Sequence, residues 1–133
     1  MKKPRITSDF ELKIEASVKP SESPDKVTVA VANMIDCSPE FRYGSIIVGR
    51  SYNTGSLRTI YDQVRSRSAM AVLRRVLLYN RAGNTTYFLL NKQAAFAGTV
   101  VVIDNHQESP LGPIRVTIDC PEMDSLIDWL VPI

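Results

Sequence analysis

A strict alternation of apolar and polar residues between Phe10 and Lys19 constrains the fold more than any other feature of the sequence. Apolar side chains occupy every second position, and charged or small polar side chains occupy the positions between them. Because successive side chains of a β-strand point to opposite faces of a sheet, this pattern predicts a strand with one buried and one solvated face. The buried face requires a hydrophobic layer packed against it.

The first half of the chain continues with helical and strand patterns. A helix is predicted from Pro24, with Ser23 as its N-cap, and Cys37-Ser38-Pro39 ends it. A second strand is predicted from Phe41 to Gly49, followed by a turn and helix cap at Asn53–Ser56. The segment 57–81 resembles one long helix, but its apolar stripe shifts around the helix axis across residues 66–68. We therefore expect two helices, or one helix with a sharp kink there.

The second half predicts a strand at Thr85–Leu90, a short helix over 92–97 between an Asn91 cap and Gly98, and a strand over 99–103 that is apolar enough to be central. A further strand is expected at Ile114–Asp119, and a final helix opens at Pro121. The predicted order is β-α-β-αα-β-α-β-β-α. The predicted fold class is α+β, with a mixed β-sheet and helices packed on it in a single domain over residues 10–133, after a polar N-terminal tail over 1–9.

Several classes of function lack support in the sequence. Cys37 and Cys120 are far apart and form no metal-binding pair, which favours reduced structural thiols in a cytoplasmic protein, although one disulfide remains an alternative. No apolar run approaches the roughly 20 residues of a membrane span. His106 is the one histidine and falls in a predicted loop, while Asp124 and Asp128 are expected on a solvated helix edge. We therefore predict no metal, no cofactor and no catalytic residue, and a protein that is not an enzyme.

Positive charge is concentrated in the middle of the chain. Residues 42–92 contain nine basic side chains and one acidic side chain, Asp62, whereas the segments on either side are acidic. Eight of the nine cations are arginines, whose planar guanidinium groups bind phosphate through two hydrogen bonds. These arginines either face solvent, where they attract a polyanion, or pair with the acidic flanks in the folded chain. The sequence leaves both alternatives open.

One candidate contact is an arginine ridge, which we define as Arg67, Arg74 and Arg81. The three are seven residues apart, so on a continuous helix they line one edge and drift by about 20° per step. Arg75 lies on an adjoining face. Such a ridge can follow successive phosphates of a nucleic acid, but it can equally be an ordinary solvated helix face.

A second candidate contact is the turn at Asn91-Lys92-Gln93. A helix N-terminus with a neighbouring lysine favours an anion such as phosphate, although Asn91 can simply cap its own helix. In the preceding strand, Tyr87 and Phe88 point to opposite faces. One of them is expected in the core, and the other could stack on a base.

Three segments together resemble an uncharacterised family of small archaeal proteins that is described as RNA-binding, one branch of which is described as a predicted exosome subunit. These segments are Leu89–Gly98 (LNKQAAFAG after the first leucine), Pro110–Ile114 (PLGPI) and Ile127–Leu130 (IDWL). The resemblance covers most of the chain. The sequence departs from the family at Cys120, where an aspartate cap is usual, and in the loop 104–109.

The resemblance implies RNA as a partner and a homodimer as the assembly, with Leu77-Leu78-Tyr79 as a candidate dimer patch. It places the family's polar block on Asn91, Lys92 and Gln93. The alternative is a homodimeric interaction protein that docks an acidic protein partner. Combining charge and resemblance, the predicted nucleic-acid-binding residues are Arg58, Arg65, Arg67, Arg74, Arg75, Arg81, Asn91, Lys92 and Gln93.

Overall fold

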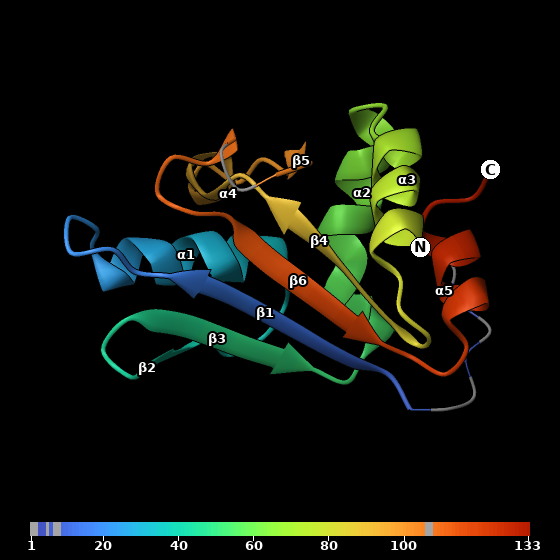
Figure 1. Cartoon of the computed structure of the whole chain (residues 1–133), viewed down its shortest axis with the longest axis horizontal. Helices are drawn as coiled ribbons and strands as arrows, with labels where there is room; N and C mark the ends of the chain where they lie inside the picture. Colours follow the sequence, from blue (N-terminus) through green and yellow to red (C-terminus); the bar gives the residue numbers. More distant parts are fainter. Residues whose placement is uncertain (1–2, 5, 7–8, 106–107) are drawn as a thin grey trace.

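The computed structural model describes residues 3–4, 6, 9–105 and 108–133, which form one sheet with helices against it (Figure 1). Six strands pair in the order β2-β3-β1-β6-β4-β5. The strands are β1 (Glu11–Ser17), β2 (Glu40–Arg42), β3 (Ile46–Ser51), β4 (Thr85–Leu90), β5 (Val102–Ile103) and β6 (Ile114–Asp119). The helices are α1 (Pro24–Met34), the 3-10 helix η1 (Thr54–Leu57), α2 (Arg58–Ser66), α3 (Met70–Asn80), α4 (Lys92–Phe96) and α5 (Met123–Leu130).

The single α+β domain predicted from the sequence is confirmed. The sheet differs from the prediction in its strand directions, since all pairs among the described strands are antiparallel, whereas a mixed sheet was expected. Antiparallel sheets commonly keep one face in water, because hairpins do not place helices on both sides.

Strands β1 and β6 form the centre of the sheet, and each of them buries only one of its two faces. Their inward residues are fully or almost fully buried, and the alternate residues lie at the opposite face. Figure 1 shows α1 and α2 passing behind the strands, with α3 beside α2. None of the described helices covers the opposite face of β1 and β6, so the alternation predicted the layer arrangement correctly. The buried residues of the two strands are Leu12, Ile14, Ala16, Ile114, Val116 and Ile118.

The amphipathic helices bury the faces that their spacing predicts. Helix α1 begins at Pro24 with Ser23 at the N-cap, but the Ser23 side chain makes no capping hydrogen bond. The short helix α4 is capped by Asn91, whose Oδ1 accepts from the Ala94 amide at 2.9 Å, and Gly98 follows it with a φ of +83°. The inward residues of α1 and α5 are Val27, Ala30, Val31, Met34, Met123, Leu126, Ile127 and Leu130.

The prediction of one strand over Phe41–Gly49 is wrong, because this segment forms the β2–β3 hairpin. Tyr43 and Gly44 have φ values of 55° and 68°, and the Ser45 amide donates to the Arg42 carbonyl at 3.2 Å. Two consecutive residues with positive φ characterise a type I′ turn, and residues 43–45 connect Arg42 to its strand partner Ile46. Gly44 signals this turn in the sequence, but Tyr43 is an unusual residue for its first central position.

The prediction of a central strand over 99–103 is also wrong. Only Val102–Ile103 pairs, and it does so at the edge of the sheet. The backbone before it is satisfied by a side chain instead of a strand: Gln63 accepts from the Val100 amide at 2.7 Å and donates to the Gly98 carbonyl at 2.8 Å. Since backbone groups need partners but not necessarily a strand, an apolar segment of this kind can be buried without extending the ladder.

The predicted break between two helices is confirmed at residues 67–69. Helix α2 ends at Ser66, and α3 begins at Met70. Ser68 has a φ of 55°, which reverses the local backbone and lets both apolar stripes face the sheet. His106 lies outside the described residues, and so does part of the expected tail over 1–9, although Ile6 packs against the core.

We predict that Tyr43→Asn stabilises the protein. A left-handed backbone costs an ordinary L-residue roughly 1–2 kcal/mol, and asparagine tolerates it better, so the free energy of unfolding is expected to rise by about 0.5–1 kcal/mol. Urea denaturation measures this change. Tyr52→Asn is the matched control, because Tyr52 is exposed but has no positive φ. A Tyr43→Asn variant less stable than the Tyr52→Asn variant would contradict the strain argument.

Candidate nucleic-acid interface

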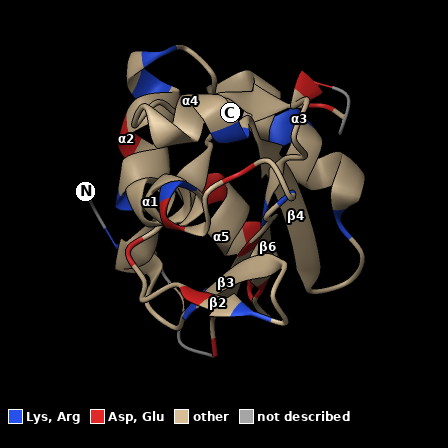
Figure 2. Cartoon of the chain, turned by 90° about the vertical axis from the view of Figure 1, so that its left-hand side faces the viewer, with Lys and Arg blue, Asp and Glu red and all other residues tan. Residues whose placement is uncertain are grey.

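The nine predicted site residues do not form one common surface. Six arginines belong to α2, α3 and their flanking residues, and the polar turn belongs to the start of α4. Within the first group, Arg65, Arg74 and Arg81 are oriented by contacts with helix α5. Figure 2 shows Lys and Arg interspersed with Asp and Glu around the end of the molecule formed by α1, β2 and β3. That end therefore offers no field of a single sign.

Three of the arginines hold helix α5 against α2 and α3. Arg65 donates to the carbonyls of Leu130 at 3.0 Å and Trp129 at 3.3 Å. Arg74 donates to the Val131 carbonyl at 2.9 Å. The last carbonyls of a helix have no partner within the helix and carry its negative dipole end, so guanidinium groups stabilise them well.

The same contact includes two carboxylates of α5. Arg74 pairs with Asp128 at 3.0 Å, and Arg81 forms a short ion pair with Asp124. Asp124 and Asp128 are one helical turn apart on α5, and Arg74 of α3 and Arg81 at its C-cap reach them with their long side chains. For Arg74 and Arg81, the structure therefore shows the internal pairing that the sequence left as an alternative.

Arg65 is further fixed by aromatic contacts. Its guanidinium carbon lies 3.4 Å from the centroid of the Tyr61 ring, and that ring lies 5.2 Å from the ring of Trp129. Cation–π contacts of this kind add to the hydrogen bonds when the guanidinium is partly shielded from water. Arg65 thus joins α2 to α5 and has little freedom to bind a ligand.

The predicted arginine ridge of Arg67, Arg74 and Arg81 is not a continuous helix edge. Arg67 is the C-cap of α2 and precedes the break, while Arg81 is the C-cap of α3. The seven-residue spacing therefore does not place the three side chains on one edge, because the chain between Arg67 and Arg74 is not helical throughout. Of the three, Arg67 remains exposed, whereas Arg74 and Arg81 face α5.

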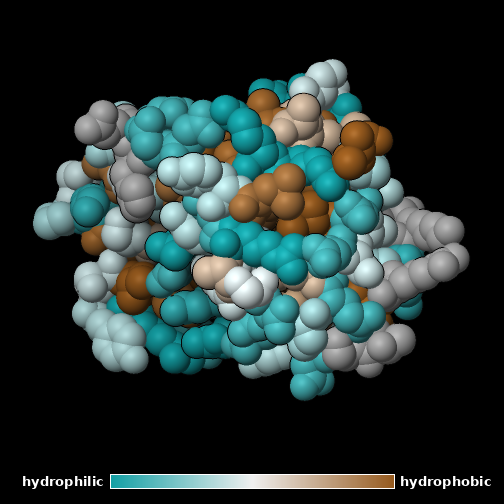
Figure 3. Space-filling model, turned by 45° about the vertical axis from the view of Figure 1, so that its right-hand side comes forward, coloured by the Kyte–Doolittle hydropathy of each residue, from teal (hydrophilic) through white to brown (hydrophobic). Residues whose placement is uncertain are grey.

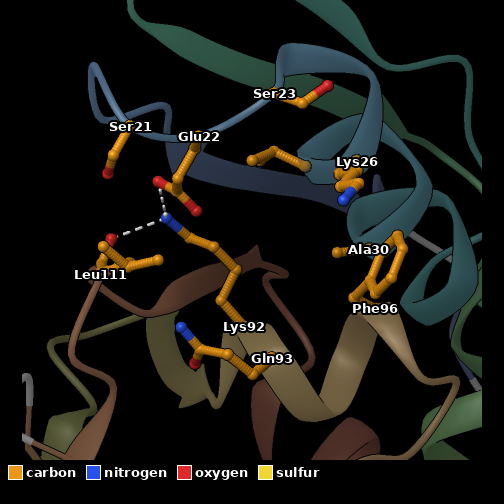
Figure 4. A pocket seen from close by; sticks show the side chains of 10 residues that line it. Ser21, Glu22, Ser23, Lys26, Ala30, Lys92, Gln93, Phe96 and Leu111 are labelled. Atoms are coloured by element: carbon orange, nitrogen blue, oxygen red, sulfur yellow. Dashed lines mark hydrogen bonds and ion pairs between the residues drawn. The ribbon is translucent and has the colours of Figure 1, made fainter.

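Lys92 is a structural residue of the α4 turn. It is 3% exposed, and its ammonium donates to the carbonyls of Ser17 at 2.8 Å and Leu111 at 2.7 Å, and to Glu22 at 3.0 Å. Figure 4 shows its side chain extending toward Glu22 and Leu111. An ammonium has three N–H donors, and all three are used. Lys92 therefore ties three segments together and does not offer its charge to a phosphate.

The two neighbours of Lys92 have different surroundings. Asn91 caps α4 and also donates to the Glu108 carbonyl at 3.0 Å. Gln93 is exposed and lines a cleft of ≈ 370 Å³ together with Lys26 and Phe96. Of the predicted turn, only Gln93 presents its side chain to solvent.

Three predicted arginines remain available at the surface of α2 and α3. Arg58 and Arg75 have side chains that are 72% and 64% exposed, and their carboxylate partners are Asp62 at 3.6 Å and Asp104 at 3.4 Å. Arg67 is exposed and has no carboxylate within 4.0 Å among the described residues. Exposed pairs of this kind contribute about 0–1 kcal/mol, so a phosphate can compete with them.

Aromatic and apolar side chains beside these arginines complete the surface. Tyr79, on the outer side of α3, is 88% exposed. Tyr87 lies at the helix-free face of the sheet, where the Arg115 guanidinium carbon is 4.0 Å from its ring centroid. The sequence analysis did not identify Arg115. Its place on the sheet follows from the pairing of β4 with β6, which sets Arg115 opposite Leu89, and this pairing is not visible in the sequence. Apolar side chains also gather in groups on the face shown in Figure 3, bordered by hydrophilic ones.

The two thiols show no sign of activation. Burial raises the pKa of Cys37, and the charge of Asp36 raises it further. Burial also raises the pKa of Cys120. Since the thiolate is the reactive form, both residues are poor nucleophiles at neutral pH. Within the described residues, no cluster of three potential metal ligands occurs, and every helix is too short or too polar to cross a bilayer.

The fold and this surface define a small α+β protein that exposes Arg58, Arg67 and Arg75 on its helical layer. A family model described as RNA binding matches residues 11–120. The UPF0201 protein of Sulfurisphaera tokodaii is 39% identical over 123 residues, which cover 90% of this chain and 85% of that protein. The chain therefore belongs to the UPF0201 family, whose model is described as RNA binding.

Solved structures agree with this assignment. The UPF0201 protein from Methanococcus jannaschii superimposes with a TM-score of 0.76 and 28% identity, over 92% of this chain and 93% of that chain. A DUF54 protein from Methanothermobacter thermautotrophicus has the same fold, with a TM-score of 0.62 and 19% identity over 91% of this chain and 95% of that chain. The resemblance to an archaeal RNA-binding family is thus confirmed.

We predict that Lys92→Met is severely destabilising. The substitution keeps most of the side-chain volume but leaves the Glu22 carboxylate buried without its cation, which costs about 3–5 kcal/mol. Thermal and urea unfolding measure the loss, and adding Glu22→Gln should recover part of it. The control is Lys26→Met, an exposed lysine of α1, for which we expect a change within about 0.5 kcal/mol. Equal effects of the two lysine substitutions would show that the ion pair is not structural.

Proposed function

We propose that this protein binds RNA without catalysis and contacts its phosphates through the exposed arginines of α2 and α3. The observation that carries the proposal is the availability of Arg58, Arg67 and Arg75 in a member of a family described as RNA binding. All three lie within the segment that has almost no negative charge. A mobile guanidinium in water attracts a phosphate at long range and then binds it through two hydrogen bonds.

The proposal assigns different roles to the remaining predicted residues. Arg65, Arg74 and Arg81 keep α5 in place without contacting the ligand directly, and Asp128 and Asp124 neutralise the last two. Lys92 and Asn91 shape the α4 turn. Gln93 can donate a hydrogen bond to a sugar or base of an RNA that extends past α4, since its side chain faces solvent.

The absence of catalysis is part of the same proposal. The resolved pKa shifts in the described part of the chain are upward for Cys37, Cys120 and Arg42. A higher pKa keeps a thiol protonated, which is the opposite of what an activated nucleophile requires. Lys92 borders a cleft, but its three donors are already engaged.

We predict that RNA binding depends steeply on salt and on Arg67 and Arg75. If three phosphates are neutralised, the slope of log K against log salt is about −2 for a single strand, and a roughly fourfold rise in salt weakens binding about 20-fold. Arg67→Ala and Arg75→Ala should each reduce the magnitude of this slope by about 0.7. Filter binding with a labelled mixed-sequence RNA of about 20 nucleotides, longer than the ~4–16 that a small domain covers, measures both effects.

The control for this experiment is Lys26→Ala, which removes an exposed cation from α1 instead of α2 or α3. Its slope is expected to equal that of the unaltered protein. No retention of RNA at low salt, or retention that salt does not change, would rule out the proposed phosphate contacts.

A second candidate function, homodimer formation, is favoured by an apolar groove beside α3. The groove has a volume of ≈ 970 Å³ and includes Met70, Leu78 and Ile133, of which Leu78 is 48% exposed. Exposed apolar side chains that line a common groove are typical of surfaces that bind another protein. The arginines at its rim also suit the acidic protein partner considered from the sequence.

We predict that Leu78→Glu abolishes this association if it occurs. A carboxylate introduced at the centre of an apolar contact would have to be desolvated, so the dimer should dissociate to monomers. Analytical ultracentrifugation of the unaltered protein and the variant measures the mass directly. The control is Val29→Glu, another exposed apolar position, on α1. A monomeric unaltered protein at high concentration would refute the dimer.

A further inference from the structure

A hollow at the junction of α3 and β4 combines two tyrosines with an arginine. It has a volume of ≈ 330 Å³ and is lined by Arg75, Val76, Tyr79, Asn80, Tyr87 and Asp104. This volume lies within the range of about 300–1,000 Å³ that small-ligand pockets have. Tyr79 and Arg75 also line the neighbouring groove of ≈ 970 Å³, so the two depressions meet along one side of α3.

The two tyrosines are held on a rigid base. The Asn80 side chain donates to the Tyr87 carbonyl at 3.0 Å, and the Thr86 hydroxyl donates to the Leu77 carbonyl at 2.6 Å. These bonds fix the end of α3 against β4, which is paired with β6 along its length. The Tyr79 and Tyr87 backbones therefore keep a constant separation, while the Tyr79 ring stays almost fully in water.

The charge around these hollows complements a polyanion. The described residues that line the larger groove include Arg65, Arg74 and Arg75 but no carboxylate side chain, and of the three arginines Arg74 is paired with Asp128 outside the groove lining. In the smaller hollow, Asp104 is the one carboxylate among the described lining residues, and it lies 3.4 Å from Arg75 with more than half of its side chain exposed. A phosphate can take the place of Asp104 at Arg75, because a contact this exposed is weak.

We propose that this hollow receives an unpaired RNA base, which stacks on Tyr79 and contacts Tyr87, whose ring also carries Arg115, while Arg75 holds an adjacent phosphate. The inference rests on the proposed function and specifies its ligand as single-stranded RNA. In a duplex the flat faces of the bases are covered by their neighbours, whereas an unpaired base offers both faces to aromatic side chains. Stacking of this kind does not depend on which base is present, so it adds affinity with little sequence preference.

Tyr79→Ala and Tyr79→Phe separate stacking from other contributions. Loss of one stacked base is expected to weaken binding of the single-stranded RNA about tenfold in Tyr79→Ala, whereas Tyr79→Phe keeps the ring and should bind as the unaltered protein does. The same RNA annealed to its complement should bind more weakly and should not respond to either substitution. The salt slope should stay constant, because no phosphate contact is removed.

A second pair of variants tests the role of the Asp104 carboxylate and the location of the base-binding hollow. Asp104→Asn removes the group that competes with phosphate at Arg75, so binding should tighten several-fold. Tyr43→Asn is the matched control, because Tyr43 is also 88% exposed but lies at the β2–β3 turn across the sheet. It should leave the affinity unchanged.

The outcomes distinguish the inference from the proposed function. If RNA is retained with the expected salt dependence but Tyr79→Ala has no effect, or weakens single and double strands equally, the base hollow is refuted and the phosphate contacts stand. A loss in Tyr79→Phe equal to that in Tyr79→Ala would also refute stacking. If Tyr79→Ala converts a dimer to a monomer in ultracentrifugation, the hollow is an interface between two copies and the inference fails. If no RNA is retained at any salt concentration, both proposals fall.

Discussion

One-sided burial of the antiparallel sheet is the constraint on which the rest of the structure depends. Because β1 and β6 bury every second side chain, the helical layer has to pack on one face. This requirement explains the break at Ser68, since a straight helix over 57–81 would turn one of its two apolar stripes away from the sheet. It also explains the position of α5, which packs at the side of α2 and α3 and needs polar partners for its last carbonyls.

The arrangement of α5 decides how much of the positive charge can act on a ligand. Arg74 and Arg81 are neutralised by Asp128 and Asp124, and Arg65 is fixed by carbonyls and the Tyr61 ring. The basic middle of the chain therefore has a structural part, which assembles the helical layer, and a smaller exposed part. A count of charges along the sequence overestimates the field at the surface, because the acidic final helix folds back onto the basic helices.

The comparison of sequence and structure separates local signals from long-range ones. The strand at Glu11–Ser17, the Asn91 cap and the helix break could be predicted because each depends on residues that are neighbours in sequence. The shortness of β5 could not be predicted. The backbone before it bonds to the side chain of Gln63, which reaches this segment from α2, instead of to a neighbouring strand. The partners of Lys92 were hidden for the same reason, since Glu22 is 70 residues away in sequence.

The three predicted arginines that face solvent on the helical layer also limit what their phosphate contacts alone can achieve. Phosphates are alike along any nucleic acid, so contacts to them position the ligand but do not distinguish one RNA from another, or a single strand from a duplex. With few such contacts, the electrostatic part of the binding free energy is small at physiological salt, because each contact releases only one counterion. A useful affinity then requires a further contribution to the binding free energy that salt does not screen. Aromatic side chains can supply it, and Tyr79 and Tyr87 line the same hollow as Arg75.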